Sequence, residues 1–150
     1  MSIIPLIKDF MTTSVTTLDP EMSIIDAITI FTHKGLGGAP VVDENNHVLG
    51  ILTERDTMSV AANGSFFNGN FGTVKTYMNP DVKTVHPDND LFYLASRFRN
   101  EPFRRYPVVK NDILVGVVSR KDVLTECLRL WKMNTQKSTN FLTKYLHANA

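Results

Sequence analysis

Apolar and polar positions form a short series of distinct patterns in the first part of the chain. The segment 14–20, "SVTTLDP", is rich in β-branched residues and closes at a proline, which predicts a short strand. Segment 22–35 places apolar residues three and four positions apart, with Ser23 and Asp26 in capping-box spacing, which predicts a helix. Its apolar face holds Ile24, Ile25, Ile28 and Phe31. Residues 39–53, "APVVDENNHVLGILT", are two apolar runs around a polar turn, which predicts a β-hairpin, and a second helix follows.

The same order of patterns is written a second time. At an offset of 67 residues, Met11, Val15, Thr17, Pro20, Phe31, Pro40, Val41 and Val42 recur as Met78, Val82, Thr84, Pro87, Phe98, Pro107, Val108 and Val109. The offset then drops to 66, so that "GILTERD" at 50–56 returns as "GVVSRKD" at 116–122. The lost residue falls in the hairpin turn, where a deletion disturbs packing least. The second predicted helix face holds Leu91, Phe92, Ala95 and Phe98. The chain is therefore one β-α-β-β-α unit repeated.

These patterns divide the chain into four parts. Residues 1–61 form the first unit with an N-terminal lead-in, and residues 74–130 form the second unit. Residues 62–73 are rich in glycine and asparagine, which predicts a linker. Its Phe66, Phe67 and Phe71 are expected to anchor it on the core, and the alternative is that they stack on a base. Residues 131–150 are helical in character and lie outside the repeat, as a C-terminal extension.

Composition narrows the class of protein without naming its task. Of the 150 residues, 43% are hydrophobic, and the net charge is +1, which argues against nucleic acid as the main partner. No apolar run approaches the roughly 20 residues that span a bilayer, and the start "MSIIPLIKDF" resembles neither a signal peptide nor an anchor. A lone cysteine, Cys127, fits a reducing cytoplasm, and its leucine neighbours predict that it is buried. We expect a cytoplasmic protein that binds neither nucleic acid nor membrane.

The repeated motif, Gly-aliphatic-x-Ser/Thr-x-x-Asp, supports two interpretations. Ser/Thr-x-x-Asp at a strand-to-helix junction is a capping box, worth about 1 kcal/mol of helix stability without any ligand. The same junction also presents unpaired backbone N–H groups that favour phosphate, and an Asp carboxylate can accept both hydroxyls of a ribose. The two roles can coexist, because the hydroxyl caps the helix while the carboxylate faces a cleft.

With its duplication in register, this motif after a hairpin that begins x-Pro-Val-Val resembles a CBS-domain pair, also called a Bateman module. The resemblance covers about residues 5–130. It implies an α+β fold in which two β-α-β-β-α units pack about a pseudo-twofold axis, with two clefts between them. It also implies a regulatory module that needs no cofactor, binds AMP, ADP, ATP or S-adenosylmethionine, and signals to a separate partner. The alternative is a degenerate pair that serves only for dimerisation or protein interaction.

The resemblance assigns residues to both clefts. One cleft is expected to use Thr53, Arg55 and Asp56 with Thr84, Val85 and Tyr106. The other is expected to use Ser119, Arg120 and Asp122 with Thr17, Leu18, Ala39, Arg104 and Arg105. We predict the second as the better phosphate site, because Gly37 and Gly38 stand where the second copy has the two arginines. Residues 97–121 hold seven basic and two acidic residues, whereas residues 30–55 hold two basic and three acidic ones. The alternative for these arginines is a solvated surface stripe or a dimer contact.

Other chemistry has little support in the sequence. The four histidines are scattered without nearby ligands, so no metal site is predicted, and no Ser-His-Asp or Cys-His arrangement indicates an enzyme. Leu128, Trp131 and Met133 give the segment after Val123 an apolar surface, which predicts a homodimer unless it folds back on its own core. The regulated partner is not identified by any motif.

Overall fold

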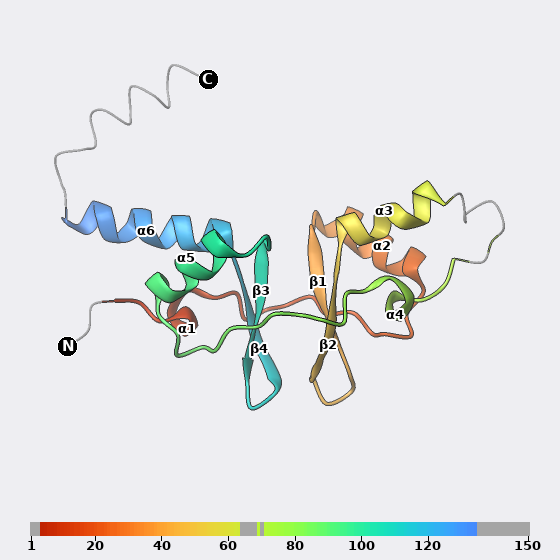
Figure 1. Ribbon diagram of the computed structural model, residues 1–150, viewed down its shortest axis with the longest axis horizontal. Coiled ribbons are helices and arrows are strands. Elements are labelled where there is room, and N and C mark those ends of the chain that lie inside the picture. The colour runs from red at the N-terminus through yellow and green to blue at the C-terminus, as the bar shows by residue number, and fades with distance from the viewer. Residues whose placement is uncertain (1–3, 64–68, 70, 135–150) are drawn as a thin grey trace, which may run out of the picture.

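The computed structural model describes residues 4–63, 69 and 71–134, and it consists of two similar halves (Figure 1). The first copy forms α2 (Ile24–Lys34), β1 (Gly38–Val42), β2 (Val48–Thr53) and α3 (Glu54–Ala62). The second forms α5 (Leu91–Asn100), β3 (Arg105–Lys110), β4 (Ile113–Ser119) and α6 (Arg120–Asn134). One-turn helices, α1 (Ile7–Phe10) and α4 (Val74–Tyr77), precede the two copies. The predicted α+β fold of two repeated units is confirmed.

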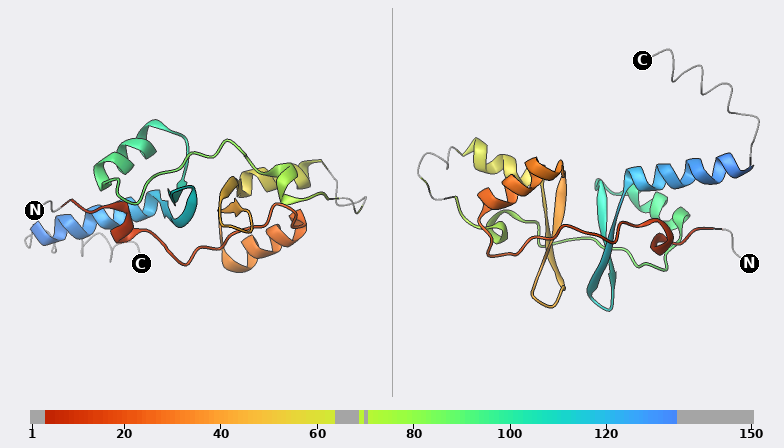
Figure 2. Two further views of the ribbon diagram at one scale, coloured as in Figure 1. Left: turned by 90° about the horizontal axis from the view of Figure 1, so that it is seen from below. Right: turned by 180° about the vertical axis from the view of Figure 1, so that it is seen from behind.

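The two hairpins stand side by side at the centre of the molecule, with the helices of each copy on the outer side (Figure 2). β1 pairs with β2 and β3 pairs with β4, both antiparallel, and the register of each ladder shifts by one residue between two consecutive valines, Val41 and Val42 in one and Val108 and Val109 in the other. Alternate side chains therefore face the helices and are buried. These are Ala39, Val41 and Leu52 in the first copy and Tyr106, Val108 and Val118 in the second.

The predicted first strand of each copy is shorter than expected. Only Leu18 and Val85 pair, each in a single parallel bridge, with Val41 and Val108. The Leu18 N–H donates to the Pro40 carbonyl at 2.9 Å. A proline stands two residues after each bridging residue, and proline lacks an N–H donor, so the strand cannot extend. The prediction of a short strand ending at the proline, in residues 14–20 and in the equivalent residues 81–87, was therefore correct in place but too long.

The helices follow the predicted faces with one exception. Ser23 caps α2, its Oγ accepting from the Ile25 N–H at 3.2 Å, and Asp90 caps α5 in the same manner at the Tyr93 N–H. In α5 the buried residues are Leu91, Leu94 and Phe98, whereas Phe92 is 64% exposed. With about 3.6 residues per turn, position 92 lies well to the side of the stripe that the other three form. The prediction that Phe92 belongs to the core was therefore wrong.

Each copy completes its core with the lead-in helix of the other copy. Ile7 of α1 is fully buried in the core of the second copy, and Val74 of α4 is fully buried in the core of the first. The chain beside each helix then joins the opposite hairpin. Thr12 exchanges two backbone hydrogen bonds with Val117, at 3.0 and 2.9 Å, and Asn79 exchanges two of the same lengths with Ile51. The two units are thus interlocked rather than merely in contact.

The glycine of the repeated motif is explained by this crossing. A Cβ on Gly116 would lie 2.9 Å from the Thr12 carbonyl oxygen and 2.6 Å from the Met11 Sδ. On Gly50 it would lie 2.8 Å from the Asn79 carbonyl oxygen and 2.9 Å from the sulfur of the equivalent methionine. Only a residue without a side chain allows the backbone to approach this closely. The motif glycine therefore has a packing role.

The hairpin tips form a second junction between the copies. The Leu114 N–H donates to the Asn46 carbonyl at 3.0 Å, and the Asn46 Nδ2 donates back to the Leu114 carbonyl at 2.9 Å. Asn46 holds a left-handed conformation with φ 66°, which asparagine tolerates better than most residues. The sheets are consequently joined both at their tips and through the crossing segments.

The remaining predictions concern the chain ends and the surface. α6 runs without interruption from the second unit through residue 134, and the rest of the predicted extension lies outside the described residues. Phe66 and Phe67 of the predicted linker also lie outside them, whereas Phe71 packs against the core of the first copy. Cys127 is exposed, contrary to prediction, and the buried residues of α6 are Val123 and Glu126. Within the described ranges, no helix has the length and apolar character needed to cross a membrane.

Substituting Gly116 with alanine tests the crossing. The added methyl meets the backbone of Thr12, which cannot move without breaking the bridge, so Gly116→Ala should lower the free energy of unfolding by about 1–3 kcal/mol. Gly37→Ala is the matched control, because the three atoms nearest to its methyl all lie at the flexible end of the Arg105 side chain. Urea denaturation followed by circular dichroism measures both. Equal midpoints for Gly116→Ala and the unsubstituted protein would contradict the packing role.

Candidate functional site

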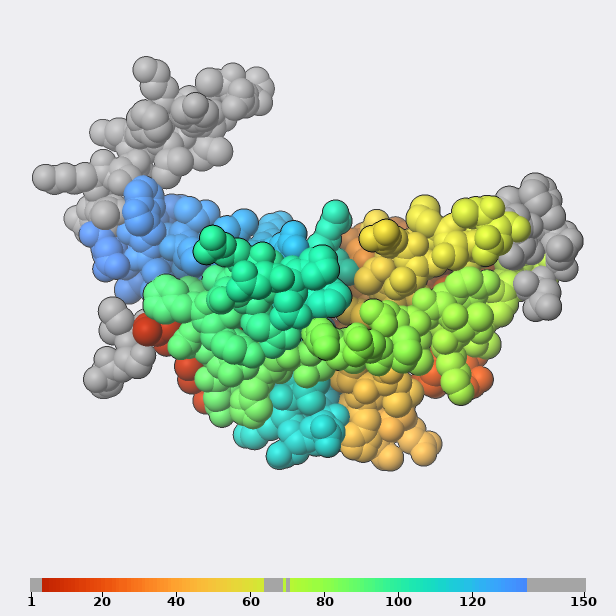
Figure 3. Space-filling model, in the orientation of Figure 1, coloured from red at the N-terminus to blue at the C-terminus, as the bar shows by residue number. Residues whose placement is uncertain are grey.

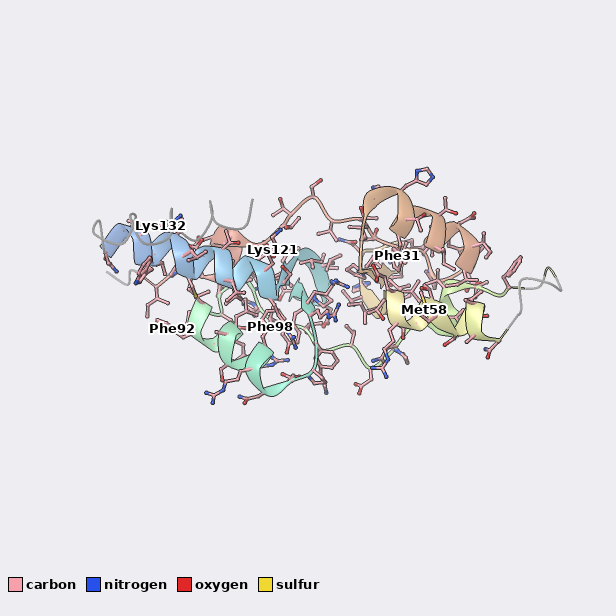
Figure 4. All side chains as sticks on the ribbon, turned by 90° about the horizontal axis from the view of Figure 1, so that it is seen from above. Phe31, Met58, Phe92, Phe98, Lys121 and Lys132 are labelled. Atoms are coloured by element: carbon pink, nitrogen blue, oxygen red, sulfur yellow. The ribbon has the colours of Figure 1, made fainter. Side chains whose placement is uncertain are left out.

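The two motifs lie where β2 and β4 end and α3 and α6 begin, near the centre of the molecule. From these inner ends the two helices run outward in opposite directions (Figure 1). The surface is hollowed between α6 and α3, and the chain just before β3 rises within the hollow (Figure 3). Seen from above, Lys121 lies at the inner end of α6 (Figure 4). Both copies of the motif therefore border one concave region.

Each motif forms a capping box. In the first copy, the Asp56 Oδ2 accepts from the Thr53 N–H at 2.8 Å and from the Thr53 hydroxyl at 2.9 Å. In the second, the Asp122 Oδ2 accepts from the Ser119 N–H at 2.8 Å, and the Ser119 Oγ accepts from the Asp122 N–H at 3.2 Å. The interpretation of the motif as a helix cap is therefore correct in both copies.

The cap uses only half of each carboxylate. Oδ2 makes all the hydrogen bonds of Asp56 and Asp122 within the described part of the chain, so Oδ1 of each remains able to accept from a ligand. The cap also fixes the direction of the carboxylate, because its Oδ2 is tied to the backbone of the hydroxyl residue. A capping role and a binding role are thus compatible in this geometry.

Arg104 and Arg105 come to the second motif through the backbone. Arg105 stands opposite Ser119 in the ladder of β3 and β4, and the Arg104 carbonyl accepts from the Arg120 N–H at 3.0 Å. In the first copy, Gly38 stands opposite Thr53, and the Gly37 carbonyl accepts from the Glu54 N–H at the same distance. Backbone pairing therefore brings five of the predicted residues together at one junction, namely Arg104, Arg105, Ser119, Arg120 and Asp122.

The Arg105 side chain, however, points toward the first copy. Its guanidinium lies against Gly37 and Gly38, so close that a Cβ on either glycine would be within 2.7 Å of one of its nitrogens. Burial lowers the pKa of Arg105, and the charge of Glu54 partly opposes that effect. The first junction, which the sequence leaves without a basic residue at these positions, thus receives a cation from the second copy.

Arg97 contributes to the basic balance of the second half but is already engaged. Its guanidinium pairs with Glu101, donates to the Tyr93 hydroxyl at 2.9 Å and lies 4.9 Å from the centre of the Tyr106 ring. Burial lowers the pKa of Arg97, but the hydrogen bonds to Glu101 and Tyr93 outweigh burial and raise it overall. Counting charges along the sequence overstates the cations that a ligand could use.

Several predicted cleft residues turn their side chains inward. Tyr106 is fully buried, with its ring 4.7 Å from that of Phe98 and its hydroxyl donating to the Arg97 carbonyl. Three further residues are at most 4% exposed, namely Leu18, Ala39 and Val85. Thr17 and Thr84 are half-buried, and Arg55 is exposed. The side chains of Tyr106, Leu18, Ala39 and Val85 therefore pack into the two hydrophobic cores, and only the backbone groups of these four residues could contact a ligand.

A shallow cavity of about 370 Å³ lies elsewhere in the second copy. Its lining is Thr84, Val85, His86, Asn89, Tyr93, Val109, Asn111 and Asp112. It shares two residues with the predicted clefts but none with either capping box. Sequence reasoning missed the others, because no spacing along the chain brings the turn at 111–112 to the start of α5. No group of three metal-ligating side chains occurs in the ranges that the structure describes.

Comparison with known proteins identifies the class to which this fold and these junctions belong. Residues 7–63 and 74–129 each match the CBS domain family. The two matches span most of the chain, so the protein belongs to the CBS domain family, as a tandem pair, and the resemblance seen in the sequence is confirmed.

Three relatives illustrate the likeness. The CBS domain-containing protein YhcV of Bacillus subtilis is 28% identical over 144 residues, which cover 95% of this chain and 96% of the relative. The structure of CBSX2 from Arabidopsis thaliana in complex with AMP has a TM-score of 0.75 and 25% identity, over 83% of this chain and 97% of that chain. The CBS domain pair of protein MJ0100, in complex with 5′-methylthioadenosine and S-adenosyl-L-methionine, has a TM-score of 0.72 and 26% identity, over 88% of this chain and 99% of that chain.

The capping boxes give a prediction that needs no ligand. Asp56 accepts two hydrogen bonds and Asp122 accepts one. Asp56→Ala should therefore lower the free energy of unfolding by about 1–2 kcal/mol, and Asp122→Ala by about 1 kcal/mol. The corresponding asparagine variants, which keep an acceptor oxygen, should lose less. Urea denaturation of the four variants measures the order, and a greater loss for Asp122→Ala than for Asp56→Ala would contradict it.

Proposed function

We propose that this protein is a regulatory module that binds an adenosine nucleotide between its two CBS units. One observation carries the proposal: Asp122 is oriented by its cap at the rim of the hollow and keeps a carboxylate oxygen free within the described chain. A fixed carboxylate oxygen is a suitable acceptor for ribose hydroxyls, since its orientation requires no ordering when the ligand binds. The relatives solved with AMP, 5′-methylthioadenosine and S-adenosyl-L-methionine support the adenosine class.

The cleft of Ser119 and Asp122 is the proposed main site. Arg104 and Arg120 are exposed and tied to each other through a backbone hydrogen bond beside the cap, so their charges favour phosphate groups. Thr17, Leu18 and Ala39 of the first copy would form the opposite wall. Because Leu18 and Ala39 are buried, their contribution to that wall is through backbone groups.

The cleft of Thr53 and Asp56 is proposed as a second nucleotide site. Arg55 belongs to the first turn of α3, and Thr84, Val85 and Tyr106 of the second copy would complete the site. Its own strand contributes glycines at the positions of Arg104 and Arg105, and of these two arginines only the Arg105 guanidinium reaches it, so we propose weaker phosphate binding there than at the cleft beside Arg104 and Arg120. ADP and ATP are included in the ligand class with AMP because the hollow is open to solvent on one side (Figure 3).

The proposed output is a change in a separate protein rather than a reaction. Caps, arginines and backbone groups hold an anion but supply no nucleophile paired with a base. Ligand binding would instead alter how the two interlocked units present their outer helices to a partner. We propose that this takes place in the cytoplasm, where adenine nucleotides are available and the exposed Cys127 stays reduced.

A second function is favoured by the outer helices. Four large apolar side chains on α5 and α6 are more than half exposed, namely Phe92, Leu124, Leu128 and Met133. Figure 4 shows α5 and α6 side by side, with Phe92 on the outer side of α5. An exposed apolar surface of this kind is typical of an interface. We propose that this surface is the interface of a homodimer. A CBS pair that had lost nucleotide binding could still dimerise through it.

Substitution of the two caps tests nucleotide binding. Asp122→Asn keeps the shape and the cap but removes the charged acceptor, so affinity for AMP should fall roughly ten- to a hundredfold. Asp56→Asn should lower it less. Isothermal titration calorimetry with AMP, ATP and S-adenosylmethionine measures these affinities, and melting temperatures confirm that the variants fold. Equal AMP binding by Asp122→Asn and the unsubstituted protein would reduce the motif to a helix cap.

Sedimentation tests the dimer. At micromolar concentration the protein should sediment with twice the chain mass of 16.9 kDa. Leu124→Glu with Leu128→Glu should give one chain's mass, because charges on the surface of α6 oppose its burial. Met58→Glu, on the exposed side of α3, is the matched control for added charge. A single-chain mass for the unsubstituted protein would contradict the dimer.

A further inference from the structure

Arg105 begins beside one proposed cleft and ends beside the other. Its backbone stands opposite Ser119, whose cap orients Asp122. Its guanidinium lies against Gly37 and Gly38, and Gly38 stands opposite Thr53, the capping residue of the other cleft. We call the space over these two glycines the glycine notch. One side chain therefore connects the two junctions.

Within the described part of the chain, the guanidinium in the glycine notch makes no hydrogen bond and no ion pair, although Glu54 is near enough for its charge to affect the pKa of Arg105. The Arg105 side chain is also partly removed from water, which lowers its pKa. A desolvated cation without hydrogen bonds gains more from an anion than an exposed one does.

The notch itself exists because the first copy departs from the repeat. Gly37 occupies the position equivalent to Arg104, and Gly38 the position equivalent to Arg105. The three atoms nearest to a Cβ built on Gly37 all belong to the Arg105 guanidinium, at 2.7 to 3.6 Å, so the notch at this glycine is shaped around that side chain. A Cβ built on Gly38 would also lie 3.0 Å from the Leu52 carbonyl oxygen. Gly37 is therefore the position at which the notch can be filled with least strain.

We propose that Arg105 is a single phosphate-binding group shared by the two clefts, so that a phosphate in one cleft withdraws it from the other. With its guanidinium in the glycine notch, it serves the cleft of Thr53 and Asp56. When it leaves the notch, it serves the cleft of Ser119 and Asp122, beside its own backbone. This inference rests on the proposed nucleotide function and adds that phosphorylated nucleotides bind the two clefts with negative coupling.

The inference distinguishes ligands by their phosphate. Adenosine has no group that needs Arg105, so it should occupy the two clefts independently. AMP should bind with full affinity to whichever cleft it enters first. Binding of a second AMP to the other cleft should be weaker, because the guanidinium is then shared between two phosphates or held by the first. The two clefts are thereby made unequal for nucleotides, although both contain an intact cap.

Filling the glycine notch tests this exchange. Gly37→Ala is combined separately with Asp56→Asn, which leaves the cleft of Ser119 and Asp122, and with Asp122→Asn, which leaves the other cleft. In the first pair, expelling the guanidinium should strengthen AMP binding about three- to tenfold; in the second, it should weaken AMP binding about tenfold. Adenosine affinity should stay within about twofold in both pairs. Calorimetry with AMP and adenosine provides all four comparisons.

Two further variants keep the result unambiguous. Arg105→Ala should weaken AMP in both backgrounds and make Gly37→Ala without further effect, whereas Arg104→Ala should weaken AMP only at the cleft of Ser119 and Asp122. Gly37→Leu fills the notch more fully and should enlarge both changes, with melting temperatures verifying the fold. Changes of the same sign in both backgrounds, no change, or an equal change for adenosine would overturn the exchange. If the unsubstituted protein binds neither AMP nor adenosine, the nucleotide function fails and the exchange fails with it.

Discussion

The crossing of each lead-in segment onto the opposite hairpin is the constraint on which the rest of the structure depends. Thr12 and Asn79 bond to β4 and β2 through their backbones, and the motif glycines leave room for them. Neither copy has a complete core without the helix that the other contributes, Ile7 in one direction and Val74 in the other. Because the crossing is made twice, the two strand-to-helix junctions are held at a fixed separation. A site that takes groups from both copies needs this rigidity.

The capping boxes use the same residues for stability and for orientation. Asp56 and Asp122 stabilise the first turn of α3 and α6 with one oxygen, and the hydrogen bonds that do so prevent the carboxylate from rotating. The hydrogen-bond acceptor is therefore already oriented before a ligand binds, so less conformational entropy is lost on binding. The choice between a cap and a binding motif, which the sequence leaves open, is therefore not exclusive in the folded protein.

Much of this fold could be predicted from the sequence because the repeat reveals it. Hairpins and helices have periodic patterns, and two copies in register leave few arrangements open. Phe92 and Cys127 were misplaced, because spacing identifies an apolar stripe but not its edges, and Tyr106 was assigned to a cleft although its ring fills a core. The direction of Arg105 could not be predicted at all. A long side chain at a junction has two neighbours at similar reach, and only the folded backbone decides between them.

Gly37 and Gly38 depart from the repeat close to the pseudo-twofold axis that relates the two copies, and their position there explains the departure. Gly38 and Arg105 are equivalent positions, and they touch, so they lie close to that axis. Residues near such an axis meet their own counterparts, and two arginines there would place like charges together in a partly desolvated space. A duplicated chain avoids this repulsion when one of the two copies has no side chain at the position. Glycine in the first copy lets the arginine of the second extend across the axis. The symmetry that builds the scaffold is thereby broken at the position where the two junctions share a charge.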